Sequence, residues 1–125
     1  MGPQARQADP RAFGAAGHQR VGLILLCGPY AQVSEAAVAI GLRAVRDRSK
    51  RVRFRALEML AFSQRQSVAR RLSALRPRVP KDSHGQLDAA LAALEAENPN
   101  LFRKSLKLKP NAEIQWNRWA GSSAR

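Results

Sequence analysis

The sequence predicts an all-α fold made of antiparallel helix pairs. Val52, Ala56 and Leu60 follow one another at steps of four residues, so they share one face of a helix that must be buried. Leucines at positions 87, 91 and 94 form a second stripe of this kind. Helical patterns also begin about 31 residues apart, near positions 21, 52 and 83. Fixed periods of this length are typical of stacked repeats, in which each unit buries its apolar face against a neighbour.

The N-terminal third divides into an arm and two helices. Residues 1–17 show no hydrophobic period, and we expect them to form a flexible arm. The helical domain is expected over 18–98. Its first helix should span 20–27 and end at Gly28-Pro29. A second helix is expected over 32–46, with Ser34 as its N-cap and Gly41 at a close contact between helices.

A tight corner, residues 47–51, is expected to join that helix to the next, over 52–62. Asp47 lies just before the second helix, where its carboxylate can accept hydrogen bonds from free backbone N–H groups. The small Ala56 side chain allows the two helices to approach closely. Ile40 is expected to join the face of the 52–62 helix in one core, whereas Arg51 and Arg55 should face solvent.

Two further helices and a tail complete the prediction. Residues 64–75 should be helical up to Pro77 and Pro80, and residues 84–97 should form a helix that packs on them, capped by Asp82 or Ser83. The expected tail, 99–125, is basic and aromatic and packs on the stack. Within it, 101–109 is a strand or an extended segment, and 112–119 is a last helical turn that bears Trp116 and Trp119.

The segment 34–62 resembles the corner of a HEAT repeat, a helical-hairpin unit of the armadillo type. The residues that carry the resemblance are Asp47, Val52-Arg53, Ala56 and Leu60. It implies a short right-handed stack of antiparallel helix pairs that serves as an interaction scaffold. An ordinary amphipathic helix bundle is the alternative, because it has similar apolar spacing.

Length and composition agree with a single domain that can bury a core. A chain of 125 residues with 45% hydrophobic residues can bury a core, and its low aromatic content, 6%, suits helices packed through Ala, Leu and Val. The only cysteine, Cys27, excludes an internal disulfide. The apolar run that ends at Cys27 is much shorter than the about 20 residues that span a bilayer. We therefore expect a cytoplasmic protein that does not enter membranes.

Positive charge is the second strong feature of the sequence. Lysine and arginine outnumber aspartate and glutamate 22 to 9, and thirteen of these cations lie between Arg43 and Lys81. Such a region attracts acidic proteins or phosphate backbones, although it can also be only a solvated face. We expect cations of the corner and of the following helix to align as one basic ridge. The candidate binding residues are Arg48, Lys50, Arg51, Arg55, Arg70, Arg71, Arg76, Trp116 and Trp119.

No residue pattern predicts catalysis or a cofactor. His18 and His84 are the only histidines, and neither has metal-ligand spacing. Asp82-Ser83-His84 contains the residue types of a hydrolase triad, but adjacent residues cannot adopt triad geometry, so a helix cap is the better interpretation. We expect no metal, no cofactor and no enzymatic activity.

Two functional hypotheses follow. The first is a non-catalytic interaction module that presents a basic helical-repeat surface to an acidic protein partner. The second is a nucleic-acid-binding protein that uses the arginine-rich ridge together with the C-terminal aromatics, because bases stack on aromatic rings between cations. The same aromatics can instead plug the exposed end of the helical stack.

Overall fold

The computed structural model describes residues 13–109, and its regular structure within that range is entirely helical, which confirms the all-α class. Residues 1–12 and 110–125 lie outside the described range, and with them the predicted turn at 112–119 and both tryptophans. In chain order the helices are α2 Phe13–Cys27, η2 Gly28–Tyr30, α3 Glu35–Ala44, α4 Lys50–Ser63, α5 Gln66–Leu75, η3 Arg76–Arg78, η4 Lys81–Ser83, α6 His84–Glu95 and α7 Leu101–Ser105.

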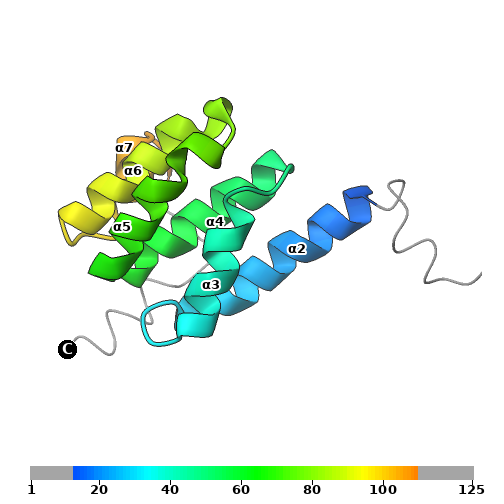
Figure 1. The fold of residues 1–125 in the computed structure, drawn as a ribbon, viewed down its shortest axis with the longest axis horizontal. Coiled ribbons are helices and arrows are strands. Elements are labelled where there is room, and N and C mark those ends of the chain that lie inside the picture. The colour runs from blue at the N-terminus through cyan, green and yellow to red at the C-terminus, as the bar shows by residue number, and fades with distance from the viewer. Residues whose placement is uncertain (1–12, 110–125) are drawn as a thin grey trace, which may run out of the picture.

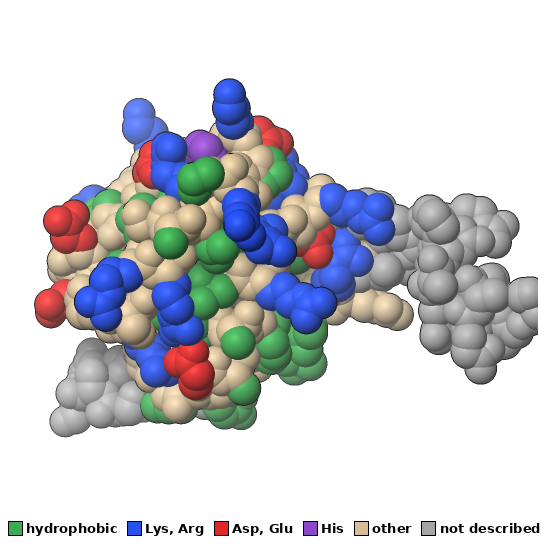
Figure 2. Space-filling model, in the orientation of Figure 1, with side chains coloured by type: hydrophobic (Ala, Val, Ile, Leu, Met, Phe, Trp, Pro, Cys, Tyr) green, Lys and Arg blue, Asp and Glu red, His purple; other side chains and the backbone are tan. Residues whose placement is uncertain are grey.

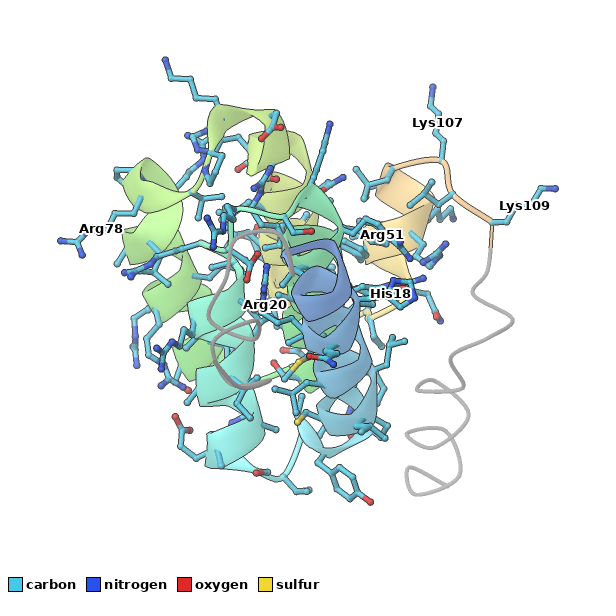
Figure 3. The ribbon with its side chains drawn as sticks, turned by 90° about the vertical axis from the view of Figure 1, so that its right-hand side faces the viewer. His18, Arg20, Arg51, Arg78, Lys107 and Lys109 are labelled. Atoms are coloured by element: carbon cyan, nitrogen blue, oxygen red, sulfur yellow. The ribbon has the colours of Figure 1, made fainter. Side chains whose placement is uncertain are left out.

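Helix α4 lies at the centre of three layers. It packs against α2 on one side and α6 on the other, so that these three helices run side by side (Figure 1). Helices α3 and α5 cover one face of this middle layer, and α7 lies on the opposite face, against α6 and α4 (Figure 3). Among the described residues, no helix is both long and apolar enough to cross a membrane.

Two predicted boundaries were wrong. Helix α2 begins at Phe13 rather than at residue 20, so residues 13–17, which we had assigned to the arm, are helical. Residues 101–105 form α7 and not a strand or an extended tail. Phe102 at the centre of α7 is buried against α4, where its ring lies 5.6 Å from that of Phe54. A five-residue helix is unstable alone, and here tertiary packing supplies its stability.

Serines cap the two helices of the central pair. The Ser34 hydroxyl accepts a hydrogen bond from the backbone N–H of Ala37 at 3.1 Å, which confirms the predicted cap of α3. At the start of α4 the cap is Ser49, whose hydroxyl accepts from the Val52 N–H at 3.4 Å. The N-cap residue is therefore Ser49, and the prediction that Asp47 accepts a hydrogen bond from a free backbone N–H near the start of this helix is confirmed. Asp47 accepts from the Ser49 N–H at 2.8 Å and so shapes the turn that places the cap.

The core forms two adjoining clusters around α4. Ala56 and Leu60 are fully buried in the larger cluster, together with residues of α5, α6 and α7. Ile40 packs instead on the smaller cluster, which contains Ile24 of α2 and Met59. It therefore does not join Ala56 and Leu60 as predicted; the next residue, Gly41, is the one that faces Leu60 and Met59 closely.

Two polar bridges recur between successive helix pairs. Arg20 of α2 binds the Asp47 carboxylate in the corner before α4, at 2.6 and 2.9 Å, and Arg53 of α4 binds Asp82 before α6 at 3.0 Å. In the same way, Gln32 donates to the Phe62 carbonyl at 3.2 Å, and Gln64 donates to the Ala93 carbonyl at 3.4 Å. The donors of each kind are separated by 33 and 32 residues. The two arginine bridges and the two glutamine contacts therefore have almost the same spacing along the chain.

Candidate functional site

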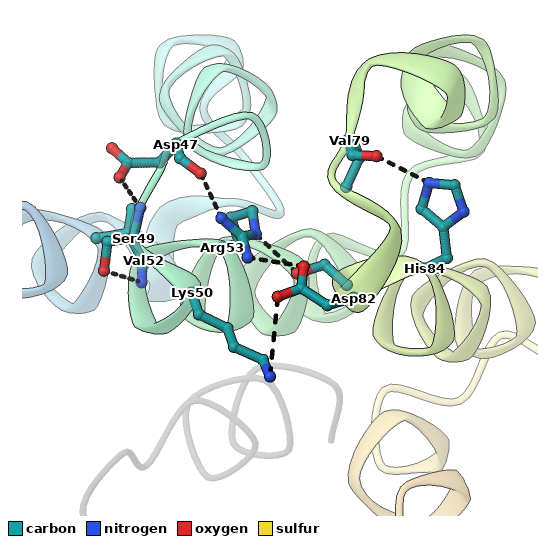
Figure 4. A network of polar contacts seen from close by, with 9 residues as sticks. Asp47, Ser49, Lys50, Val52, Arg53, Val79, Asp82 and His84 are labelled. Carbon is teal, nitrogen blue, oxygen red and sulfur yellow. Dashed lines mark hydrogen bonds and ion pairs between the residues drawn. The ribbon is translucent and has the colours of Figure 1, made fainter.

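The cations of the predicted ridge have different environments. At the corner before α4, Arg53 is buried and Lys50 is exposed (Figure 4). Arg53 is buried: its Nε donates to Ser83 Oγ at 2.7 Å, and its Nη1 donates to the Asp47 carbonyl at 2.8 Å. Its Nη2 completes the set at the Asp82 carboxylate. Lys50 reaches the same carboxylate at 3.9 Å but stays exposed. Arg53 therefore joins the corners before α4 and α6 and is not a surface contact.

The Asp82-Ser83-His84 segment also has a structural role. Ser83 is the residue before α6, but its hydroxyl makes no cap hydrogen bond and accepts from Arg53 instead, which corrects our assignment of a side-chain cap to Ser83 or Asp82. The Nε2 atom of His84 lies 3.0 Å from the Arg76 carbonyl and 2.9 Å from the Val79 carbonyl. These contacts hold the turn between α5 and α6 in place.

Arg55 is partly buried, which contradicts the prediction that it faces solvent. It pairs with Glu58 at 2.9 Å, and Arg103 of α7 reaches the other oxygen of this buried carboxylate at 2.7 Å. Both guanidinium groups lie over the ring of Phe54, at 5.5 and 5.8 Å from its centroid. Arg55 therefore belongs to the joint that attaches α7 to α4.

The predicted single ridge is divided between two sides of the molecule. Figure 3 shows Arg51 on the side of α7, together with His18, Lys107 and Lys109, whereas Arg78 extends from the side of α3 and α5. Arg48 and Arg51 are exposed. Arg51 therefore does not align with Arg78, or with Arg71, which binds Glu35 of α3.

The layer of α3 and α5 carries a distinct basic face. We use this name for Arg43 and Arg46 at the end of α3, Arg70 on α5 and Arg78 on η3, all of which are exposed. Within residues 13–109 none of these four has a carboxylate partner at ion-pair distance. Figure 2 shows blue side chains spread over this layer with few red ones between them. The face thus presents arginines whose hydrogen-bond donors are available to a ligand.

Paired arginines surround the basic face. Arg65 and Arg71 bind Glu35 across α3 and α5, at 3.1 and 2.7 Å, and Arg76 binds both oxygens of Asp88 at 3.1 Å. The hydrogen bond from Arg71 is the main reason that the pKa of Glu35 is lowered, and the hydrogen bond from Arg76 lowers the pKa of Asp88. Two candidate residues, Arg71 and Arg76, therefore already bind carboxylates inside the protein.

The described part of the chain holds no group of three or more His, Cys, Asp and Glu side chains placed to bind a metal ion. Cys27 is partly buried beside the smaller core cluster. Sequence reasoning missed Arg103 and the burial of Arg53. The recurrence of Arg20 at Arg53, 33 residues later, was a signal in the sequence that could have identified the bridging arginines.

Comparison with known proteins gives no match: no family model, no curated protein and no solved structure is similar to the chain at a significant level.

Proposed function

We propose that the chain is a non-catalytic interaction module built as a short HEAT-like stack. The two recurring bridges support this proposal, because Arg20–Asp47 and Arg53–Asp82 connect each inner helix to the corner of the next pair. Bridges at a constant period are expected when units stack by the same geometry, as they do in helical repeats. The packing of an ordinary helix bundle does not require equivalent bridges at equal spacing along the chain.

The proposed partner is an acidic protein, and the basic face is its docking surface. The observation that carries the proposal is that Arg43, Arg46, Arg70 and Arg78 lie exposed on one layer without carboxylate partners among the described residues. Guanidinium groups bind carboxylates with two parallel hydrogen bonds, as Arg76 does with Asp88 in this protein. A net charge of +13 would also accelerate the approach of an acidic partner.

Two variants of equal charge would test the docking surface. The first replaces Arg43, Arg46, Arg70 and Arg78 by glutamine, and the matched control replaces Arg51, Lys104, Lys107 and Lys109 on the side of α7. The probe is fluorescent poly-L-glutamate, titrated at a low and a high NaCl concentration. We expect the first variant to lose about tenfold or more in affinity, because four exposed contacts at ~0.5 kcal/mol each exceed the ~1.4 kcal/mol of a tenfold change. Its salt dependence should flatten.

The control variant should retain most of the affinity, and both variants should melt near the wild-type temperature because exposed charges contribute little to folding. Equal losses in the two variants would show that only the net charge matters. Absence of binding to poly-L-glutamate even at low salt would contradict the proposal. Random duplex DNA titrated in parallel gives the remaining outcome: tighter binding to DNA, lost in the first variant alone, would identify a nucleic-acid-binding protein.

A further inference from the structure

Glu35 places a carboxylate between two arginines of another helix. It is the first residue of α3, and its Oε1 lies 3.1 Å from Nη2 of Arg65, the residue before α5. Its Oε2 lies 2.7 Å from Nη1 of Arg71. The Glu35 side chain is nevertheless 57% exposed, so solvent reaches the carboxylate while both arginines hold it.

The two arginines that bind Glu35 come from different positions along the chain. Arg65 is the N-cap residue before α5, and Arg71 lies six positions further along the chain, within that helix. The Nε atom of Arg71 is shielded from solvent although its side chain as a whole is 40% exposed, and its terminal nitrogens bind Glu35. A guanidinium held in this way needs little further ordering to bind a carboxylate, which favours binding.

Glu35 itself holds these arginines weakly. Exposed ion pairs contribute little to stability, because water screens the attraction and the pair restricts two long side chains. A partner that presents several carboxylates can therefore exchange one of them for Glu35. Arg70 of the basic face is the residue before Arg71 on α5, so Arg71 and part of the basic face lie on the same helix.

We infer that Arg65 and Arg71 form a carboxylate-binding subsite for the acidic partner and that Glu35 is its internal occupant, displaced when the partner binds. This inference rests on the proposed function and adds a specific position to it. Removal of the Glu35 charge should therefore strengthen binding of the acidic partner by more than the added net charge alone would, because two arginines are released at once.

The test compares Glu35→Gln with Glu95→Gln in titrations with poly-L-glutamate. Glu95 is an exposed carboxylate of α6 without an ion-pair partner in the described range, so this control changes the net charge equally but releases no arginine. We expect Glu35→Gln to bind ~1.5- to 5-fold more tightly than the control, the range that an exposed ion pair of ordinary strength implies. The double variant Glu35→Gln/Arg71→Gln should lose this gain.

The outcomes test the displacement of Glu35 separately from the docking surface. If the wild type binds the probe and Glu35→Gln binds no better than Glu95→Gln, the displacement by the partner is wrong, whereas the docking surface stands. The same holds if Glu35→Gln binds more weakly than the wild type, which would mean that Glu35 only orders the arginines. If no form binds the probe, the proposed function fails. Thermal melting of each variant confirms that all are folded.

Discussion

Two arginines of α4, only two positions apart, have opposite roles at the residue scale. Arg51 is exposed, whereas the Arg53 side chain is only 5% exposed and makes three hydrogen bonds. Successive residues of a helix are rotated by about 100°, so side chains two positions apart point to nearly opposite faces. The geometry of α4 therefore decides which of these charges faces solvent and which one joins two corners of the fold.

The buried arginine should be far more sensitive to substitution. Replacing Arg53 by glutamine removes the guanidinium N–H groups that donate to Ser83 Oγ and to the Asp47 carbonyl. Ser83 is fully buried, so water cannot replace the lost donor there. Unsatisfied buried groups cost ~1–3 kcal/mol, and we expect that loss in the free energy of unfolding measured with urea. Arg51→Gln is the control and should change it by less than ~0.5 kcal/mol. Equal effects of the two substitutions would show that Arg53 does not connect the corners.

At the scale of helices, Gly41 decides how closely α3 approaches α4. A Cβ atom at this position would lie 3.0 Å from Cδ2 of Leu60 and 3.2 Å from Cε of Met59, both of which are fully buried. The sequence prediction of a close contact at Gly41 is thus confirmed. Larger side chains would separate the two helices because the surrounding core is already filled.

Two glycine substitutions should therefore have opposite effects. Gly41→Val is expected to cost ~1–3 kcal/mol of unfolding free energy by overpacking. Gly85 of α6 is exposed and a Cβ there meets nothing within 4 Å, so Gly85→Ala should stabilise the protein by up to ~1 kcal/mol through helix propensity. Urea unfolding of both variants measures the two values. A neutral Gly41→Val would place α3 further from α4 than the structure does.

The corner before α4 should make stability depend on acid. Burial alone would raise the pKa of Asp47, but hydrogen bonds from Arg20 and from the Ser49 N–H, with the charges of Arg20 and Arg48, outweigh it and lower the pKa below its ordinary 3.8. The stabilisation is therefore complete above the unfolded-state pKa and is lost as the pH falls through the folded-state pKa.

Asp47→Asn removes that charge at every pH. The wild type should exceed this variant in unfolding free energy by a constant margin near neutral pH, and the margin should shrink as the pH falls from about 5 towards about 2. Urea unfolding at several pH values measures it. Asp88→Asn, which changes an exposed pair, serves as the comparison and should show a smaller margin. A margin that does not depend on pH would contradict a role of the Asp47 charge.

At the scale of the whole molecule, excess positive charge opposes compaction. The chain carries a net charge of +13, and several exposed arginines have no carboxylate within reach in the described range. Salt should therefore raise the melting temperature by screening the mutual repulsion, until it also weakens the bridges at the corners. Thermal melting between low and physiological NaCl concentration measures this. A steady fall of the melting temperature with salt would mean that ion pairs, and not repulsion, dominate.

Much of the helical pattern could be predicted, whereas the candidate site could not. The α3, α4, α5 and α6 segments were predicted within a few residues because their apolar positions repeat every three to four residues. The predicted ridge included Arg51, Arg55 and Arg71. Arg51 is exposed on the α7 side, Arg55 is packed between α4 and α7, and Arg71 is paired with Glu35. The spacing of residues in the sequence predicts which face of its own helix a side chain occupies. It does not predict which other helix or side chain that face contacts.

The sequence by itself determined helices α3 to α6, the Ser34 cap and the close contact at Gly41, since these depend on hydrophobic period and local backbone chemistry. Only the tertiary structure decided that Arg53 is buried, that residues 101–105 form a helix and that the basic face lies on α3 and α5. These outcomes depend on contacts between residues 29 to 48 positions apart, such as Arg53 with Asp82 and Phe54 with Phe102. Such contacts form only once the helices are packed, and no local pattern encodes them.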